Sequence, residues 1–224
     1  MDFLKNTPIL YINLEHRQDR RISTIKQFSQ FGIEPTRFNA IVVPNMDGAF
    51  GCSESHLKCL QIAKENKWDR VFICEDDIIF INPKGFLSKL ESFLETHSWD
   101  VLLVGGINHK PFIDVDDTCV KITNCNSTTG YIVKAAYYDK LINNIMNGLN
   151  LKYNTSYEDS GKYSIDQYWK ILQNQDKWFM LKPPTVIQAS GYSDIGGGDF
   201  NWIPLFLNYD NPDNNLILDY LSPS

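Results

Sequence analysis

The sequence lacks a long hydrophobic run. No stretch approaches the ~18 to 20 consecutive apolar residues of a membrane-spanning helix. Residues 1–6 also lack the basic start and apolar core of a secretory signal. The five cysteines are an odd number, and no two have the spacing of a zinc knuckle. We therefore expect a cytoplasmic protein with free thiols and no integral membrane segment.

Basic residues are also in short supply. Lys and Arg number 21 against 27 Asp and Glu, which gives a formal net charge of −6. A nucleic-acid partner bound through a broad positive surface is therefore not expected, although a local basic pocket for one small anion stays open. Hydrophobic residues make up 43% of the 224 positions, which is too many for a disordered chain and enough for a real core.

Several catalytic signatures are missing. The chain has no Walker A sequence, no G-x-G-x-x-G, no G-x-S-x-G and no H-E-x-x-H. The sequence therefore gives no support for a P-loop, dinucleotide-binding, serine-hydrolase or zincin function, because the motifs of these classes are absent. The aspartates Asp114, Asp116 and Asp117 lack the glycine and the distal glutamate of an EF-hand loop.

Short apolar runs alternate with helical patterns along most of the chain. The expected strands are residues 8–14, 71–74, 101–104, 131–133 and 185–187. This rhythm predicts an α/β fold with a mostly parallel central sheet flanked by helices. Because no repeat or linker marks a boundary, we expect a single domain over residues 1–224, with a core of about 8–195 and a docking C-terminal segment of about 196–224.

Two of the expected helices bear on function. Apolar residues at helical spacing along 22–28 predict a stripe that faces the core. A helix through residues 57–63 is expected to be capped by Ser53 or Ser55, which would place His56 in its first turn. A histidine there either faces a ligand or forms a hydrogen bond inside the core.

Three consecutive acids, Glu75, Asp76 and Asp77, interrupt the apolar run 71–81, which reads as a buried strand. Like charges in a poorly solvated place repel and raise at least one pKa unless a cation or hydrogen-bond donors compensate. A divalent ion would compensate at the carboxyl end of a strand, where open α/β sheets bind ligands. A solvated turn is the alternative, but the apolar flanks favour a site.

Three arginines lie at the start of an expected helix, where the helix dipole favours acids instead. Arg17 and either Arg20 or Arg21 could face the same way and hold a phosphate beside the helix N-terminus. Pairing with Glu15 and Asp19 is the alternative interpretation.

Three further segments have two interpretations each. The hydroxyl-rich segment 126–131 suits close approach of a polar ligand or an ordinary turn. Asp166, near a helix start, could act as a base or could only interact favourably with the positive end of the helix dipole. The glycine-containing segment 188–198 could close over a substrate or only let the chain turn.

Taken in order, these pieces resemble glycosyltransferase family 25, the family of lipopolysaccharide glycosyltransferases and procollagen galactosyltransferases. The matching stretches span about residues 8–195 and are INLEHRQDRR, RFNA, GCSESHLKCL, VFICEDDIIF, WDVLLVGG, TTGYIVKAAYYDKL, SIDQYW and GYSDI. The resemblance implies one GT-A domain. It also implies a metal-dependent, inverting enzyme that moves a hexose, galactose or glucose, from a UDP-sugar to a hydroxyl of a glycan or of hydroxylysine.

The resemblance also implies roles for individual residues. Mn²⁺ or Mg²⁺ would be held by Asp77 with Glu75 and Gln188, the last at a place where GT-A enzymes often have a histidine. Asp166 would be the base, with Asp194 in reserve. The residues expected to face the nucleotide-sugar donor are Asn13, Leu14, Arg17, Arg21, Ser55, His56, Glu75, Asp76, Thr128, Thr129 and Gly130.

Two other functions stay open on the sequence alone. A non-catalytic domain of the same fold would bind a nucleotide-sugar or glycan without turnover, an alternative slightly favoured by Gln188 in place of histidine. An acid-cluster phosphohydrolase is the weaker alternative. Aromatic residues suited to stacking on a sugar are Tyr163, Trp169, Tyr192 and Trp202.

Overall fold

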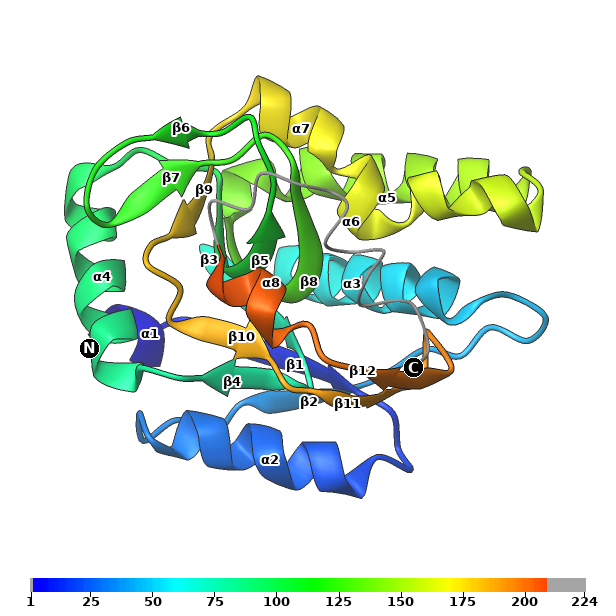
Figure 1. Ribbon diagram of the computed structural model, residues 1–224, viewed down its shortest axis with the longest axis horizontal. Helices are drawn as coiled ribbons and strands as arrows, with labels where there is room; N and C mark the ends of the chain where they lie inside the picture. The colour runs from blue at the N-terminus through cyan, green and yellow to red at the C-terminus, as the bar shows by residue number, and fades with distance from the viewer. Residues whose placement is uncertain (1, 209–224) are drawn as a thin grey trace.

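The computed structural model describes residues 2–208, which form helices on both faces of one large sheet (Figure 1). The strands lie in the order β2-β1-β3-β8-β5-β9-β7-β6. Their bounds are Thr36–Asn39 (β2), Ile9–Asn13 (β1), Arg70–Glu75 (β3), Cys125–Lys134 (β8), Val101–Asn108 (β5), Trp178–Leu181 (β9), Cys119–Lys121 (β7) and Ile113–Asp114 (β6).

The sheet is mixed. Strand β1 pairs in parallel with β2 and β3, and β5 pairs in parallel with β9. Strand β8 lies antiparallel between β3 and β5. The predicted α/β fold around a central sheet is confirmed. The strand expected at 185–187 is β10 (Val186–Gln188), which pairs instead with β4 (Ile78–Phe80) in a separate two-stranded sheet.

Alternate residues of the central strands enter two cores, as a pleated sheet requires. One core packs beneath α3 (Gly48–Glu65), α5 (Tyr138–Tyr153), α6 (Ile165–Tyr168) and α7 (Lys170–Gln175). The other packs beneath α1 (Asp2–Lys5), α2 (Gln18–Ser29) and α4 (Pro83–Thr96). The 3₁₀ segments Ala135–Tyr137 and Tyr157–Tyr163 flank α5. The sheet is therefore covered on both faces, and its strand ends carry the polar groups.

Helix α2 turns a different face to the core from the one predicted. Phe28 is fully buried, but Ile22 and Ile25 are 69% and 40% exposed, so their assignment to the core was wrong. The buried face instead follows the four-residue spacing of Arg20, Thr24 and Phe28. The Thr24 hydroxyl donates to the backbone carbonyl of Asp76 at 2.8 Å. This polar contact fixes the rotation of α2 and aims Arg20 at the acidic segment.

Helix α3 begins earlier than predicted. Its N-cap is Asp47, whose Oδ1 accepts from the Phe50 backbone N–H at 2.8 Å and whose Oδ2 lies 2.7 Å from the Lys152 ammonium. Ser53 and Ser55 are inside the helix, so the predicted serine caps were wrong. His56 accordingly lies in the middle of the helix and not in its first turn.

A glycine in α3 allows the preceding loop to approach the helix. A Cβ at Gly51 would lie 2.3 Å from the carbonyl oxygen of Ile41. We expect Gly51→Ala to lower the free energy of unfolding by ~1 to 3 kcal/mol, the usual cost of overpacking, measured by urea denaturation. Gly161→Ala is the control, because a Cβ there meets nothing within 4 Å. Equal stability of the two variants would mean that the loop at Ile41 moves to make room for the added Cβ.

The last described residues form a hairpin and a short helix. Strands β11 (Gly191–Ser193) and β12 (Gly198–Phe200) pair antiparallel. Helix α8 (Ile203–Leu207) buries Leu205 and Phe206 in a small cluster with Ile107 and Ile187. The remainder of the expected docking segment, 209–224, lies outside the described residues. Within residues 2–208, no helix combines the length and apolar character needed to cross a bilayer.

Candidate functional site

The candidate site lies where β1 and β3 end. Asn13 closes β1 and Glu75 closes β3. Because β8 runs antiparallel to β3, the register of Gly130 with Cys74 brings Thr128 beside these strand ends. A cavity of about 330 Å³ is formed here, a volume within the range of small-molecule sites. The acids on its wall are Asp47, Glu75, Asp76, Asp77 and Asp194, and Arg20 is the arginine beside them.

The acidic segment is buried, as predicted, but it is not a continuous strand. Strand β3 ends at Glu75 and β4 begins at Ile78, so Asp76 and Asp77 form the turn between them. Even so, they are only 7% and 4% exposed. Asp76 accepts hydrogen bonds from the Asn13 amide at 2.7 Å and from the Arg20 guanidinium at 2.9 Å. Its pKa is raised by burial, which these two donors oppose.

Asp77 has one carboxylate oxygen that accepts hydrogen bonds and one that has no hydrogen-bond partner in the described part of the chain. Its Oδ2 accepts from Arg20 at 3.1 Å and from the Gln188 side-chain amide at 3.0 Å. Its Oδ1 is buried with no hydrogen-bond partner among the described residues. Burial, followed by the negative charge of Glu75, raises the pKa of Asp77 to about 7, and Arg20 opposes the shift. A buried carboxylate oxygen without a partner is costly, so this atom is suited to a cation.

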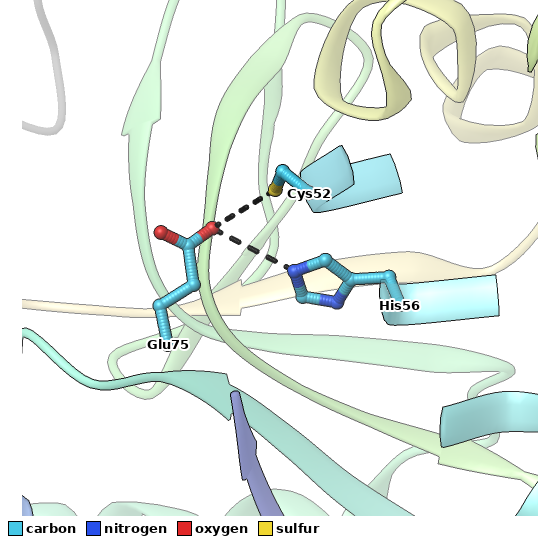
Figure 2. Close-up of side chains that lie close together, drawn as sticks. All are labelled: Cys52, His56 and Glu75. Atoms are coloured by element: carbon cyan, nitrogen blue, oxygen red, sulfur yellow. Dashed lines mark hydrogen bonds and ion pairs between the residues drawn. The ribbon is translucent and has the colours of Figure 1, made fainter. Parts of the chain in front are cut away.

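Glu75 points toward α3 (Figure 2). Its Oε1 accepts from the Thr128 hydroxyl and lies 3.6 Å from His56 Nε2 and 3.8 Å from Cys52 Sγ. His56 is fully buried, with Nδ1 3.1 Å from the Tyr131 hydroxyl. Although burial alone would raise the pKa of Glu75, the His56 and Thr128 contacts outweigh it and the net shift is downward. Glu75 is therefore the member of the cluster held as a carboxylate.

The charges of the cluster do not balance. The carboxylates of Asp76 and Asp77 pair with the guanidinium of Arg20, and Glu75 lies beside them without an ion pair to it. About two negative charges are therefore uncompensated by arginine when all three are ionised. The unpartnered Asp77 oxygen and this excess of oxygen ligands fit a hard divalent cation. Gln188 lies beside Asp77, with its amide nitrogen donating to the carboxylate.

The sequence offered two interpretations of the three arginines at the start of α2, a phosphate site or pairing with nearby acids, and the three arginines differ in their surroundings. Arg20 faces the buried acids, while Arg21 is exposed and hydrogen-bonds Tyr11. Arg17 pairs with Asp19 at 3.0 Å and also with Asp194. The Arg17 hydrogen bond lowers the pKa of Asp19 to about 2. Arg20 is thus the site residue that the sequence did not single out from its neighbour.

These arginines also hold the β11–β12 hairpin over the cavity. The backbone carbonyl of Tyr192 accepts from Arg20 at 2.8 Å and from Arg17 at 3.4 Å. Asp194, at the hairpin turn, pairs with Arg17 and lies 3.4 Å from His16. The hairpin is therefore tied to the start of α2 by ion pairs and hydrogen bonds.

A second cavity of about 290 Å³ adjoins the first and shares with it Cys52, Glu75 and Ile195. Asp166 lines this second cavity. Its Oδ2 accepts from the Ser127 backbone N–H at 3.1 Å, and burial raises its pKa. Glu75 thus separates two adjacent spaces, one beside the acidic turn and one beside Asp166.

The other expected residues have varied surroundings. Leu14 and Ser55 line the first cavity. Thr129 is buried, with its hydroxyl 2.7 Å from that of Ser127. Gly130 is packed so closely that a Cβ would lie 2.9 Å from Val104 Cγ2.

The aromatic candidates for sugar stacking differ in accessibility. Trp169 is fully buried against Tyr131 and Trp178, so it cannot stack on a sugar. Tyr192 is 51% exposed, and Tyr163 and Trp202 are half-buried. The exposed ring of Tyr192 on the β11–β12 hairpin is therefore the most accessible of the four.

Comparison with known proteins bears on this site. The model of glycosyltransferase family 25, described as lipopolysaccharide biosynthesis proteins, matches residues 46–140, which include α3 and the acidic turn. No curated protein sequence matches the chain. Among solved structures, the chain is similar to a glycosyltransferase involved in the glycosylation of the major capsid of PBCV-1. The identity is 11% and the TM-score 0.51, over 84% of this chain and 94% of that one.

Two further structures show weaker likeness. The mannose-1-phosphate geranyltransferase of Thermus thermophilus has 8% identity and a TM-score of 0.43, over 79% of this chain and 73% of that one. The nucleoside-diphosphate-sugar pyrophosphorylase of Vibrio cholerae has 11% identity and a TM-score of 0.38, over 81% and 76%. Of the three, the first supports the shared fold.

Proposed function

We propose that the chain transfers a hexose, galactose or glucose, from a UDP-sugar to a hydroxyl of a glycan or of hydroxylysine, with inversion and with a divalent metal. The match of residues 46–140 to the model of glycosyltransferase family 25 supports this proposal. The observation that carries the proposal is the buried, under-compensated acidic turn on the wall of the larger cavity. A site that binds an anion without a cation would not have three carboxylates on its wall, because they would repel the anion.

The metal-binding role falls to Asp77, with Glu75 beside it. Asp77 offers an oxygen without a partner, and Gln188 and Arg20 fix its carboxylate through the other oxygen. Mn²⁺ or Mg²⁺ held there would offset the charge that develops on the departing diphosphate. Asn13 fixes Asp76 and so sets the shape of the turn.

Inversion in one displacement requires a base on the acceptor side. Asp166 lines the second cavity, and its raised pKa suits a group that takes a proton from a hydroxyl near neutral pH. Asp194 is already paired with Arg17 and His16, which makes it the poorer candidate. We place the donor in the first cavity and the acceptor in the second, so that transfer occurs beside Glu75.

The test is UDP release by the purified protein from UDP-galactose and UDP-glucose, with Mn²⁺ or with EDTA, in the presence of glycan and hydroxylysine acceptors. Metal-dependent release supports the proposal. A donor-induced thermal shift without any release of UDP would support a binding domain instead. Release of inorganic phosphate from simple esters would support a phosphohydrolase.

The raised pKa of Asp77 predicts how Mn²⁺ stabilisation depends on pH. The pKa of the Asp77 carboxyl is about 7 in the folded protein and ~4 in the unfolded chain. Its contribution to the stability of the folded state is therefore fully present below pH 4 and is lost as the pH rises toward and through 7. Mn²⁺ binds the ionised form, so we expect it to raise the melting temperature more at pH 8 than at pH 6. Equal shifts at both pH values would contradict Asp77 as a ligand.

A further inference from the structure

A second group of potential ligands lies away from the cavities, where the C-terminal end of α4 meets the β6–β7 hairpin. His97 is the C-cap of α4, Asp116 is in the turn between β6 and β7, and Cys119 is the first residue of β7. The sequence excluded an EF-hand here and offered no cysteine pair. A mixed set of one histidine, one carboxylate and one thiol has no such spacing signature.

The three ligand atoms have separations suited to one small ion. His97 Nε2 lies 3.1 Å from Asp116 Oδ2 and 3.8 Å from Cys119 Sγ, and all three atoms lie within 4.8 Å of one another. Tetrahedral Zn²⁺ with bonds of ~2.0 to 2.3 Å to nitrogen, oxygen and sulfur requires separations of roughly 3.3 to 3.6 Å. Side-chain shifts of a few tenths of an ångström bring these two distances, from His97 to Asp116 and from His97 to Cys119, into that range.

Hydrogen bonding determines which nitrogen of His97 carries a proton. Nδ1 lies 3.2 Å from the carbonyl oxygen of Phe93, which can only accept. It also lies 2.7 Å from the Thr96 hydroxyl, which itself donates to the carbonyl of Ser92. Nδ1 is therefore protonated, and its bond to a backbone carbonyl is the arrangement found in metal-binding histidines. The other nitrogen, Nε2, faces the carboxylate of Asp116, so either a second proton on the ring or a metal ion lies between them.

The surrounding groups hold the ligands in place. Asp116 Oδ1 accepts from the Thr118 N–H at 2.7 Å and the Cys119 N–H at 3.2 Å, which directs Oδ2 toward His97. The His97 ring stacks on Phe93 with centroids 4.9 Å apart and planes at 8°. The Asp116 side chain is 40% exposed while Cys119 is buried. Solvent therefore reaches the cluster from the aspartate side, where a water could complete the coordination.

We propose that His97, Asp116 and Cys119 bind a Zn²⁺ ion, with water as the fourth ligand. On binding, the thiol of Cys119 loses its proton to solvent as the Zn–S bond forms, and the thiolate and carboxylate charges balance the ion. The ion joins the β6–β7 hairpin at the edge of the sheet to the end of α4. Its role is structural, because the cluster lies outside both cavities of the transfer site.

The test is titration of the metal-free full chain with Co²⁺ and with Zn²⁺. We expect one equivalent of Co²⁺ to produce a thiolate-to-metal charge-transfer band that Zn²⁺ abolishes. Cys119→Ser should lose the band, and His97→Gln should weaken Zn²⁺ binding at least tenfold by competition with a chromogenic chelator. Circular dichroism verifies that each variant is folded, and either variant alone suffices as a test.

The matched control is Cys52→Ser, because Cys52 belongs to a second cluster of mixed ligands within residues 2–208, with His56 and Glu75. This variant should keep the Co²⁺ band and the Zn²⁺ stoichiometry. A band that persists in Cys119→Ser and disappears in Cys52→Ser would overturn the proposal. Absence of stoichiometric binding would also overturn it and would leave His97 and Asp116 as an ordinary ion pair.

Discussion

Asp77→Asn is expected to reduce metal-dependent UDP release by ~100-fold or more, comparable to the loss of one preorganised electrostatic group in an active site. The amide keeps the shape of the side chain and its contacts with Arg20 and Gln188, but it removes the charge that the cation requires. The measurement is kcat/KM for the donor over a range of Mn²⁺ concentrations. The Mn²⁺-induced rise in melting temperature should disappear in parallel.

The same substitution should stabilise the metal-free protein at pH 8. The native aspartate must ionise there in a buried place beside Glu75 and Asp76, and asparagine avoids this cost. Asp139→Asn is the control, because Asp139 is 70% exposed on α5 and pairs with Lys64 at the surface. An Asp77→Asn enzyme that kept its Mn²⁺ dependence would show that the cation is held elsewhere.

Asp166→Asn is expected to lower kcat by ~10²- to 10⁴-fold, the usual contribution of a general base. Asparagine cannot take the proton from the acceptor hydroxyl. Because Asp166 lines the second cavity and not the first, the KM for the donor and the donor-induced thermal shift should stay unchanged. Steady-state kinetics with saturating acceptor measure the first effect and differential scanning fluorimetry the second.

Asp194→Asn separates the two candidate bases. Its loss should loosen the β11–β12 hairpin and leave Arg17 free to bind a phosphate of the donor, so we expect a lower KM for the donor and a modest change in kcat. Asp159→Asn, at an exposed position, is the control for both variants. A large fall in kcat with Asp194→Asn and a small one with Asp166→Asn would reverse the assignment of the base.

The acidic turn could be predicted from the sequence because its signal is local. Three acids between apolar segments imply burial before any tertiary contact is known, and Asp76 and Asp77 are indeed buried. The helix start was harder to predict. Asp47, Ser53 and Ser55 are all acceptable N-cap residues, and the helix extends back to Asp47 because Gly51 lets the loop at Ile41 approach it closely.

The choice between Arg20 and Arg21 needed the rotation of α2, since neighbouring helix residues point about 100° apart. That rotation is set by the contact of Thr24 with the acidic turn, a tertiary contact that no local pattern encodes. The interaction of Arg37 with the Asn13 side chain, at 2.8 Å, was likewise beyond sequence reasoning. It depends on the register of β2 beside β1. Long-range pairs of this kind are determined by topology.

The attachment of the β11–β12 hairpin has a consequence for entry into the larger cavity. Arg17 already has two carboxylate partners, and one of them, Asp194, belongs to the hairpin. A phosphate group that binds Nη1 of this guanidinium must displace Asp194, and the hairpin then loses its ion pair with Arg17. Binding of the anion and release of the β11–β12 hairpin from this ion pair are then the same event, because both depend on which group pairs with Arg17.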